Sequence, residues 1–325
     1  MCTGVRFTDI DNNLFFGRNL DVPASYGQKV MVTPRNFDIP MKHIDDIKTS
    51  KAIIGMGIVS NNYPLYFDAA NENGLGVINL NFPTHKINNK IEKDLEFFYY
   101  SYELVENKIN ITSYEFITWI LENFDKVEDI KNYNLSNKIN FIDTPLNEQI
   151  GTKPAHWLIT DNEQSIVVEP MRDGIKVYDN PVGVVTNDPT FDWHLMNLNQ
   201  YLGINYNDKE PIIWGNKQLH ALGVGSGSLG MPGDWTPASR FVKVAYINNF
   251  YPTQDCEEKN VSRLFNTLKS VAMPEGCVND GISVYSSCYS TKTKTYYYDR
   301  HDHFQIFSHT MTDETINAKD ITIFN

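Results

Sequence analysis

The chain has 325 residues, with 28 Lys and Arg against 40 Asp and Glu, which gives a formal net charge of −12. With 41% hydrophobic and 21% charged residues, it has the composition of an ordinary globular protein. The acidic balance argues against a nucleic acid or an anionic membrane surface as the main partner, because both are bound through clustered Lys and Arg.

The sequence predicts a protein of the reducing cytoplasm. Its start, MCTGVRFTDIDNN, lacks the basic and then apolar segments of a signal peptide. Its best apolar run, 52–59, is far shorter than the ~20 residues of a membrane span. Cys2, Cys256, Cys277 and Cys288 are too few for a disulfide scaffold and form no Cys-x-x-Cys pair. Free thiols and a cytoplasmic location are therefore expected.

The first predicted element in the chain is a β-hairpin. Residues 2–8 and 14–20 are strand-like runs separated by turn-forming residues. Short apolar runs predict the next strands, at 52–59, 65–70 and 76–82, the last two joined by an Asn-Glu-Asn-Gly turn.

Two helical zones alternate with further strands. Thr112 to Glu115 resembles a capping box in front of a helix with one buried face. Thr236 and Pro237 predict the cap and first residue of a helix that runs through Tyr246. The remaining runs predict a helix at 261–273, a meander of strands at 156–160, 165–170, 174–178 and 183–187, and closing strands at 284–289, 296–299 and 304–309.

These elements favour a layered α+β fold. Short connections between neighbouring strands predict mostly antiparallel pairing, because a parallel pair needs a long crossover. Strands with two separate helical zones suggest sheets covered by helices. No repeat, low-complexity tract or flexible linker divides the chain, so a single domain over 1–325 is expected.

The clearest chemistry lies at the N-terminus. Cys2 follows the initiator Met1, and a side chain this small normally permits removal of that methionine. Removal would leave a thiol of pKa ~8.5 and an α-amine of pKa ~8 on one residue, a nucleophile and a base together. The alternative is that Cys2 is an inert, small strand residue.

The predicted hairpin brings two charged residues close to Cys2. If its strands pair around residues 11–12, Cys2 faces Leu20 or Asp21, and Arg18 lies one diagonal away. An arginine beside a thiol favours the thiolate, and a carboxylate beside an α-amine orients it. The alternative is a surface ion pair that contributes little.

Three further polar residues are candidates for the same site. Arg240 lies near the first turn of its helix, where the dipole disfavours a cation by up to about 1 kcal/mol. A charge in that position often serves a neighbouring carboxylate, which could belong to a substrate, and a solvated arginine is the alternative. Asn81 and Asn187 each end an apolar run, in LNFP and VTNDP. An Asn amide can donate to an oxyanion, and turn formation before Pro is the alternative.

Two other patterns are judged to be coincidental. The run 225–230 fits G-x-G-x-x-G, but Met-Pro-Gly-Asp follows it and no βαβ unit surrounds it, which argues against a nucleotide site. His301 and His303 could share one strand face, but no third ligand is near in sequence. Neither a metal nor an organic cofactor is expected.

A series of ordered blocks extends this interpretation, namely MCTG, FGRNLD, GLGVINLNFP, HWLITD, SIVVE, VVTNDPTFDWHLMNLNQY and MPGDWTPASRFVKVAY. Together they resemble the choloylglycine hydrolase family, which contains bile salt hydrolases and penicillin V acylases. The resemblance implies an N-terminal-nucleophile hydrolase with an αββα four-layer sandwich, two antiparallel sheets between helical layers.

The resemblance also implies residue roles. Cys2 resembles the nucleophile exposed as the mature N-terminus. Arg18 of FGRN matches the arginine at the thiol, and Asp21 matches the acid that holds the α-amine. The oxyanion pair is matched by Asn81 of LNFP and Asn187 of TNDP, and the remaining catalytic arginine by Arg240 of SRF.

Asn81 also bears on the choice of substrate. Asn at this position of the LNFP block is characteristic of bile salt hydrolases, whereas penicillin V acylases typically carry Tyr. The expected reaction is therefore cleavage of glycine or taurine from conjugated bile salts. Leu20, Tyr26, Met56 and Phe67 could line an apolar pocket for the steroid, with ordinary core packing as the alternative.

Two alternatives stay open. Within the family, the enzyme could be a penicillin V acylase or an N-acyl-homoserine lactone acylase. Outside it, the chain could be a noncatalytic binding module in which Cys2 is structural. The segment 86–110 is longer than the family usually has, and could be an added helix, an oligomer contact or a rim over the pocket. The resemblance also implies a homo-oligomer, a tetramer.

Overall fold

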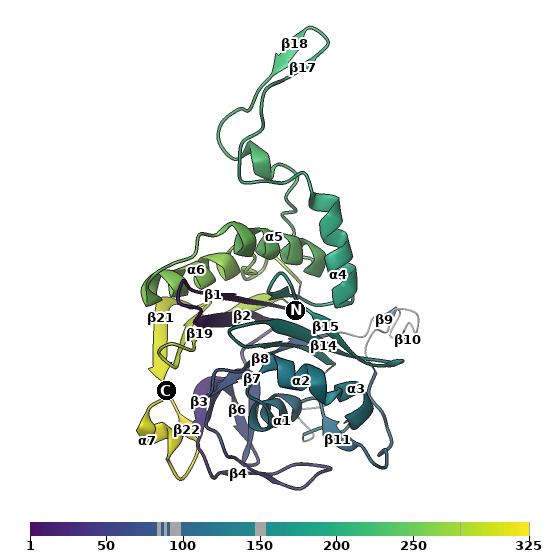
Figure 1. Ribbon diagram of the computed structural model, residues 1–325, viewed down its shortest axis with the longest axis vertical. Helices are drawn as coiled ribbons and strands as arrows, with labels where there is room; N and C mark the ends of the chain where they lie inside the picture. Colours follow the sequence, from purple (N-terminus) through teal and green to yellow (C-terminus); the bar gives the residue numbers. More distant parts are fainter. Residues whose placement is uncertain (83–85, 88–89, 92–98, 147–153, 280, 325) are drawn as a thin grey trace.

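The computed structural model describes residues 1–82, 86–87, 90–91, 99–146, 154–279 and 281–324. Two large antiparallel sheets lie face to face, and helices cover the outer face of each (Figure 1). This arrangement confirms the predicted αββα sandwich. Among the described residues, no helix is both long and apolar enough to cross a membrane.

The first sheet carries the N-terminus. It has six strands in the order β16-β1-β2-β19-β20-β21, and all their pairings are antiparallel. The strands are β1 (Cys2–Thr8), β2 (Leu14–Val22), β16 (Val184–Val185), β19 (Ile282–Ser290), β20 (Thr295–Arg300) and β21 (His303–Thr310).

The second sheet has eight strands in the order β15-β14-β13-β8-β7-β6-β3-β22. It places the central strands β8 and β13 next to each other although about 70 residues separate them in sequence. The strands are β3 (Lys29–Thr33), β6 (Ile53–Ser60), β7 (Tyr63–Asn71), β8 (Gly76–Asn81), β13 (Ala155–Thr160), β14 (Ser165–Met171), β15 (Gly174–Asp179) and β22 (Thr322–Ile323).

The helices form the outer layers. Those on the second sheet are α1 (Phe116–Asn123), α2 (Val127–Tyr133) and α3 (Leu135–Lys138), and those on the first sheet are α5 (Pro237–Phe250) and α6 (Glu257–Lys269) (Figure 1). Shorter elements are α4 (Phe191–Asn197), α7 (Asp313–Ile316), η2 (Leu198–Tyr201), η3 (Ser226–Ser228), β4 (Asp38–Ile39), β5 (Ile47–Lys48), β9 (Lys86–Ile87), β10 (Lys90–Ile91), β11 (Ile109–Thr112), β12 (Ile139–Ile142), β17 (Ile212–Trp214) and β18 (Lys217–Leu219).

The N-terminal hairpin has the predicted register. Cys2 pairs with Leu20, one of the two partners expected, and Gly4 pairs with Arg18. On the other side of β2, Gly17 lies so close to β19 that a Cβ there would be 1.9 Å from the carbonyl oxygen of Ser287. A side chain at this position would therefore push the hairpin away from β19.

Several predicted elements differ in extent or partner. Residues 183–187 do not continue the meander, because β16 crosses to the first sheet and pairs with β1. Thr112 ends β11, and α1 begins only at Phe116. Glu115 Oε2 does accept from the Thr112 amide at 2.9 Å, but the hydroxyl of Thr112 caps no helix. The later helices run over 237–250 and 257–269 instead of ending at 246 and spanning 261–273.

One part of the chain projects from the layers. Between α4 and α5, residues 198–234 form an arm whose tip is the β17–β18 hairpin (Figure 1). Large apolar side chains on it are exposed to solvent, including Leu202, Ile213, Trp214, Leu222, Val224 and Leu229. Such a concentration is unusual for a monomer and is typical of a contact surface.

Residues 88–89 and 92–98 of the long segment 86–110 lie outside the described residues. Its described parts hold the short strands β9 and β10, an isolated bridge at Ser101 and the start of β11, and they contain no helix. A rim over the pocket and an oligomer contact stay predictions for this segment.

Candidate active site

Cys2 lies at the start of β1 with its side chain between the two sheets. Gly4 shares that face of the strand, and a Cβ on Gly4 would lie 3.3 Å from Ile78 of β8 in the second sheet. Cys2 is buried, and its thiol is free. With Met1 attached, the nitrogen of Cys2 is a peptide amide, and it donates to Oδ1 of Asn187 at 2.8 Å.

Arg18 joins the thiol to the second sheet. Its Nη2 donates to Sγ of Cys2, and its Nη1 donates to the carbonyl oxygens of Phe67, at 3.0 Å, and of Asn79. These carbonyls belong to β7 and β8 one residue beyond the Asp68–Ile78 pair, so the guanidinium lies where the two strands separate. Burial lowers the pKa of Arg18, but attraction to Cys2 and nearby acidic groups outweighs it and leaves that pKa raised.

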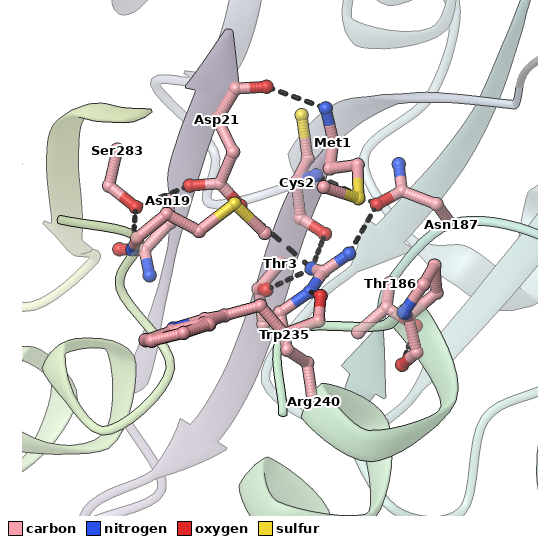
Figure 2. Close-up of polar contacts among 12 residues, drawn as sticks. Met1, Cys2, Thr3, Asn19, Asp21, Thr186, Asn187, Trp235, Arg240 and Ser283 are labelled. Carbon is pink, nitrogen blue, oxygen red and sulfur yellow. Dashed lines mark hydrogen bonds and ion pairs between the residues drawn. The ribbon is translucent and has the colours of Figure 1, made fainter. Parts of the chain in front are cut away.

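Asp21 is fully buried beside the N-terminus. Its Oδ1 accepts from Ser283 Oγ at 2.5 Å, whereas Oδ2 has no hydrogen-bond partner and lies 3.8 Å from Nη1 of Arg240. Burial raises the pKa of the Asp21 carboxyl, and the charge of Arg240 opposes the shift. The main chain of Asp21 also exchanges hydrogen bonds with Met1 (Figure 2).

Arg240 connects Cys2 to Asn187. Its Nη1 donates to the carbonyl oxygen of Cys2 and to Oγ1 of Thr3, and its Nη2 donates to Oδ1 of Asn187 at 2.8 Å (Figure 2). Burial lowers the pKa of Arg240, and Asp21 opposes that shift. The predicted cap is confirmed, because the Thr236 side chain accepts from the Ser239 amide, and it sets Arg240 in the first turn of α5.

Asn187 thus receives two donors on Oδ1, from Cys2 and Arg240, which fixes its amide. Its Nδ2 points the other way and donates to the main-chain oxygen of Asn81 at 2.6 Å. An amide nitrogen carries two hydrogens, so one N–H is left for another acceptor.

Asn81 presents its main chain to the site. The Phe82 amide donates to the carbonyl of Pro154, so the antiparallel alternation turns the N–H and C=O of Asn81 away from β13 and toward Asn187. The neighbours Leu80 and Phe82 are buried, whereas the Asn81 side chain is exposed. The structure therefore favours the main-chain N–H of Asn81 as a donor over the side-chain amide expected from the sequence.

The predicted pocket residues fall into two pairs. Leu20 and Met56 are buried in the hydrophobic core cluster. Tyr26 is half exposed, and its ring meets the partly buried ring of Phe67 edge-on at 5.7 Å. Burial and the charge of Cys2 raise the pKa of the Tyr26 hydroxyl. Contact with a substrate stays a prediction for all four residues.

Sequence reasoning missed several buried polar residues around these groups. Ser283 and Thr3 hold Asp21 and Arg240. Asp68 accepts from two tyrosine hydroxyls behind Arg18. His156 and His194 contact the main chain beside Asn187. A polar residue inside an apolar strand run, such as His156 in HWLITD, indicates a buried polar group. That pattern does not predict which residue it hydrogen-bonds to.

The two coincidental patterns lie elsewhere. Residues 225–230 include η3 in the exposed arm, with neither a preceding strand nor a following helix of the nucleotide-binding kind. Across the described ranges, no group of three or more His, Cys, Asp or Glu side chains could hold a metal ion.

Comparison with known proteins identifies the family. Residues 2–324 match the model of the linear amide C–N hydrolases, choloylglycine hydrolase family. The chain belongs to this family. A conjugated bile acid hydrolase from Lactobacillus gasseri is 45% identical over the full length of both chains. A bile salt hydrolase/transferase from Bifidobacterium longum is 40% identical over 99% of this chain and 98% of its own.

Solved structures of choloylglycine hydrolases agree with this membership. The C2A mutant of the conjugated bile acid hydrolase from Clostridium perfringens superposes with a TM-score of 0.89 at 36% identity, covering 100% of this chain and 97% of its own. The sandwich is therefore the fold of an N-terminal-nucleophile hydrolase, and this chain is a linear amide hydrolase with a cysteine at position 2.

His194 makes the stability of the fold depend on pH. Burial lowers its pKa from 6.5 to about 4, so in the folded chain it is neutral and donates from Nε2 to the Asn187 carbonyl at 2.9 Å. Between these pH values the unfolded chain binds the extra proton. The free energy of unfolding should therefore fall by up to about 3 kcal/mol as the pH drops from 6.5 to 4.

The comparison is urea unfolding at pH 7, 5.5 and 4.5 for the wild type and His194→Gln. The variant should be less stable at pH 7 and should lose less stability on acidification. Parallel pH profiles for the two proteins would mean that His194 is not the titrating group.

Proposed function

We propose that this protein hydrolyses the amide bond of glycine- or taurine-conjugated bile salts, with Cys2 as nucleophile once Met1 is removed. The observation that carries the proposal is the convergence of Arg18, Asn187 and Arg240 on residue 2. The names of the relatives supply the substrate class. No metal or organic cofactor enters the reaction.

The first half of the reaction forms a thioester. The Cys2 thiolate attacks the amide carbonyl carbon, and the carbonyl electron pair moves onto oxygen. Nδ2 of Asn187 and the main-chain N–H of Asn81 hold this oxyanion, each donor contributing roughly 3 kcal/mol. The α-amine of Cys2, having taken the thiol proton, passes it to the glycine or taurine nitrogen as the C–N bond breaks.

The second half releases the bile acid. The same amine accepts a proton from water, the hydroxide attacks the thioester, and the Cys2 sulfur leaves and recovers the proton. Arg18 stabilises the thiolate at both ends of the cycle. Asp21 orients the amine, for which its Oδ2 is available, because this oxygen has no hydrogen-bond partner.

The substrate class is tested by one assay of the processed enzyme with glycocholate, taurocholate and penicillin V. Bile salt hydrolysis well above penicillin V hydrolysis supports the proposal, and the reverse order assigns the enzyme to the acylase alternative. Intact mass after treatment with a thiol reagent tests the noncatalytic alternative, because the enzyme should lack Met1 and lose activity on labelling at one site.

Acyl transfer is a second candidate activity, favoured by the name of the Bifidobacterium relative. An amino acid with a free amine can attack the thioester in place of water, which forms a new amide and releases the thiol. Incubation of glycocholate with a second amino acid and mass detection of the new conjugate tests this activity.

We also propose that the chain works as a single domain within a cytoplasmic homo-oligomer, a tetramer. The four free thiols are consistent with a reducing compartment. The exposed apolar arm, residues 198–234, offers a surface for a second copy. Sedimentation equilibrium measures the number of subunits.

The two oxyanion donors should respond differently to truncation. Asn187→Ala removes both the Nδ2 donor and the acceptor for Arg240, so kcat should fall on the order of 10²–10³-fold. Asn81→Ala keeps the main-chain N–H, so kcat should stay within about threefold of wild type. Steady-state kinetics with glycocholate measures both. Equal losses of kcat in the two variants would mean that the side-chain amide of Asn81, and not its main-chain N–H, donates to the oxyanion.

A further inference from the structure

Two buried histidines hold consecutive carbonyl groups at the oxyanion site. Nε2 of His156, on β13, lies 2.8 Å from the carbonyl oxygen of Thr186, and Nε2 of His194, on α4, lies 2.9 Å from that of Asn187. A carbonyl only accepts, so both ring nitrogens donate. The main chain that carries the Asn187 amide is therefore fixed from two different elements.

His156 also contacts the segment that carries the other donor. Its ring stacks on that of Phe82, with centroids 4.6 Å apart and planes 3° from parallel. Phe82 directly follows Asn81, and His156 pairs with Leu80 across the β8–β13 ladder. One side chain thus touches the segments of both oxyanion donors.

The second ring nitrogen ties His156 to α4. Nδ1 lies 3.1 Å from Oε1 of Glu169, which also accepts from the Phe191 amide at the start of α4. Both ring nitrogens of His156 therefore have oxygen partners, on Thr186 and on Glu169. His156 and Glu169 are buried, so this pair is shielded from solvent.

We infer that His156 is a positioning residue that sets the spacing between the main-chain N–H of Asn81 and the side-chain amide of Asn187. The inference rests on the oxyanion role given to those two groups by the proposed function. His156 acts through Thr186 and Phe82, and it hydrogen-bonds to neither Cys2 nor Arg18. Its loss should therefore weaken oxyanion stabilisation and leave the thiolate intact.

Two reactions of Cys2 separate these effects. p-Nitrophenyl acetate acylates a thiolate through a tetrahedral oxyanion, whereas iodoacetamide alkylates it by displacement without one. His156→Phe keeps a ring against Phe82 but removes both N–H donors. We expect its acylation rate to fall by about 10-fold or more, since small misplacements at a reacting centre can cost up to about 10². The alkylation rate should stay within about twofold of wild type.

Matched variants complete the test. His156→Gln, whose amide can still donate to Thr186, should recover part of the acylation rate. Tyr66→Phe removes a buried hydroxyl elsewhere in the second sheet, and should lower stability without changing either rate. Cys2→Ser measures the background from other thiols. If His156→Phe does not fold, Glu169→Gln, which replaces the carboxyl group opposite Nδ1 by an amide, is measured in the same way.

An unchanged acylation rate in the folded variant, or an equal loss in both reactions, would overturn the inference. Because both reagents are small, the outcome does not depend on the bile salt assignment. A wild type that is acylated by p-nitrophenyl acetate but inactive on bile salts would reject the proposed substrate and still test His156.

Discussion

Cys2→Ser should lower the turnover of glycocholate on the order of 10³-fold or more, given that loss of the nucleophile in other acyl-transfer enzymes costs up to about 10⁶. The alcohol of serine is far harder to deprotonate than a thiol, and Arg18 Nη2 already donates to the sulfur of Cys2. The substitution is nearly isosteric at a buried position, so the fold should be kept. Steady-state kinetics and thermal unfolding of the same preparation measure both effects.

Cys277→Ala is the matched control, because that cysteine is exposed and far from Cys2 in sequence. Its kcat should equal that of the wild type, as should that of Cys256→Ala. Cys288 is fully buried, so Cys288→Ala should keep kcat with a modest loss of stability from the small cavity. Near-normal turnover of Cys2→Ser would place the nucleophile elsewhere.

The part of the site that the sequence could predict is the part built within one hairpin. Cys2, Arg18 and Asp21 lie on two strands joined by a short turn, so strand alternation and turn position predict their pairing. Leu20 opposite Cys2 confirms that register. The helix cap at Thr236 was equally local, and it correctly placed Arg240 in a first turn.

The rest depends on contacts between distant segments, which periodicity does not encode. The 183–187 run resembled a fourth meander strand, but packing against β1 draws it into the other sheet and carries Asn187 to the Cys2 amide. The sequence showed an Asn at 81, but whether its side chain or its main chain faces the site depends on the β8–β13 register. The sequence around His156 predicts only a strand, because its contacts with Thr186, Phe82 and Glu169 come from other segments of the chain.

Met1 occupies a regular position at the start of the N-terminal hairpin. Its amine lies 2.5 Å from the carbonyl oxygen of Asp21, and its own carbonyl accepts from the Asp21 amide at 3.0 Å. These bonds extend the β1–β2 ladder by one residue, so an unprocessed chain can hold the rest of the site in place. Arg18 still reaches the Cys2 sulfur in this form.

The unprocessed chain should nevertheless be almost inactive. A peptide nitrogen at Cys2 has no basic lone pair, so Met1 removes the group that accepts and relays the proton. Loss of a general base should cost on the order of 10²–10⁴-fold in kcat. Removal of Met1 creates an amine where the Cys2 amide now lies, 2.8 Å from Oδ1 of Asn187.

Preparations with different degrees of processing test this directly, for example from cells with limiting methionine aminopeptidase activity. Intact mass gives the fraction of chains that begin at Cys2. A plot of kcat per mole of total protein against that fraction should be a straight line through the origin. Iodoacetamide labelling should be less sensitive to processing, because the thiol and Arg18 are present in both forms. Activity that is independent of the processed fraction would mean that the base is a different group from the Cys2 amine, and that nucleophile and base do not reside on one residue.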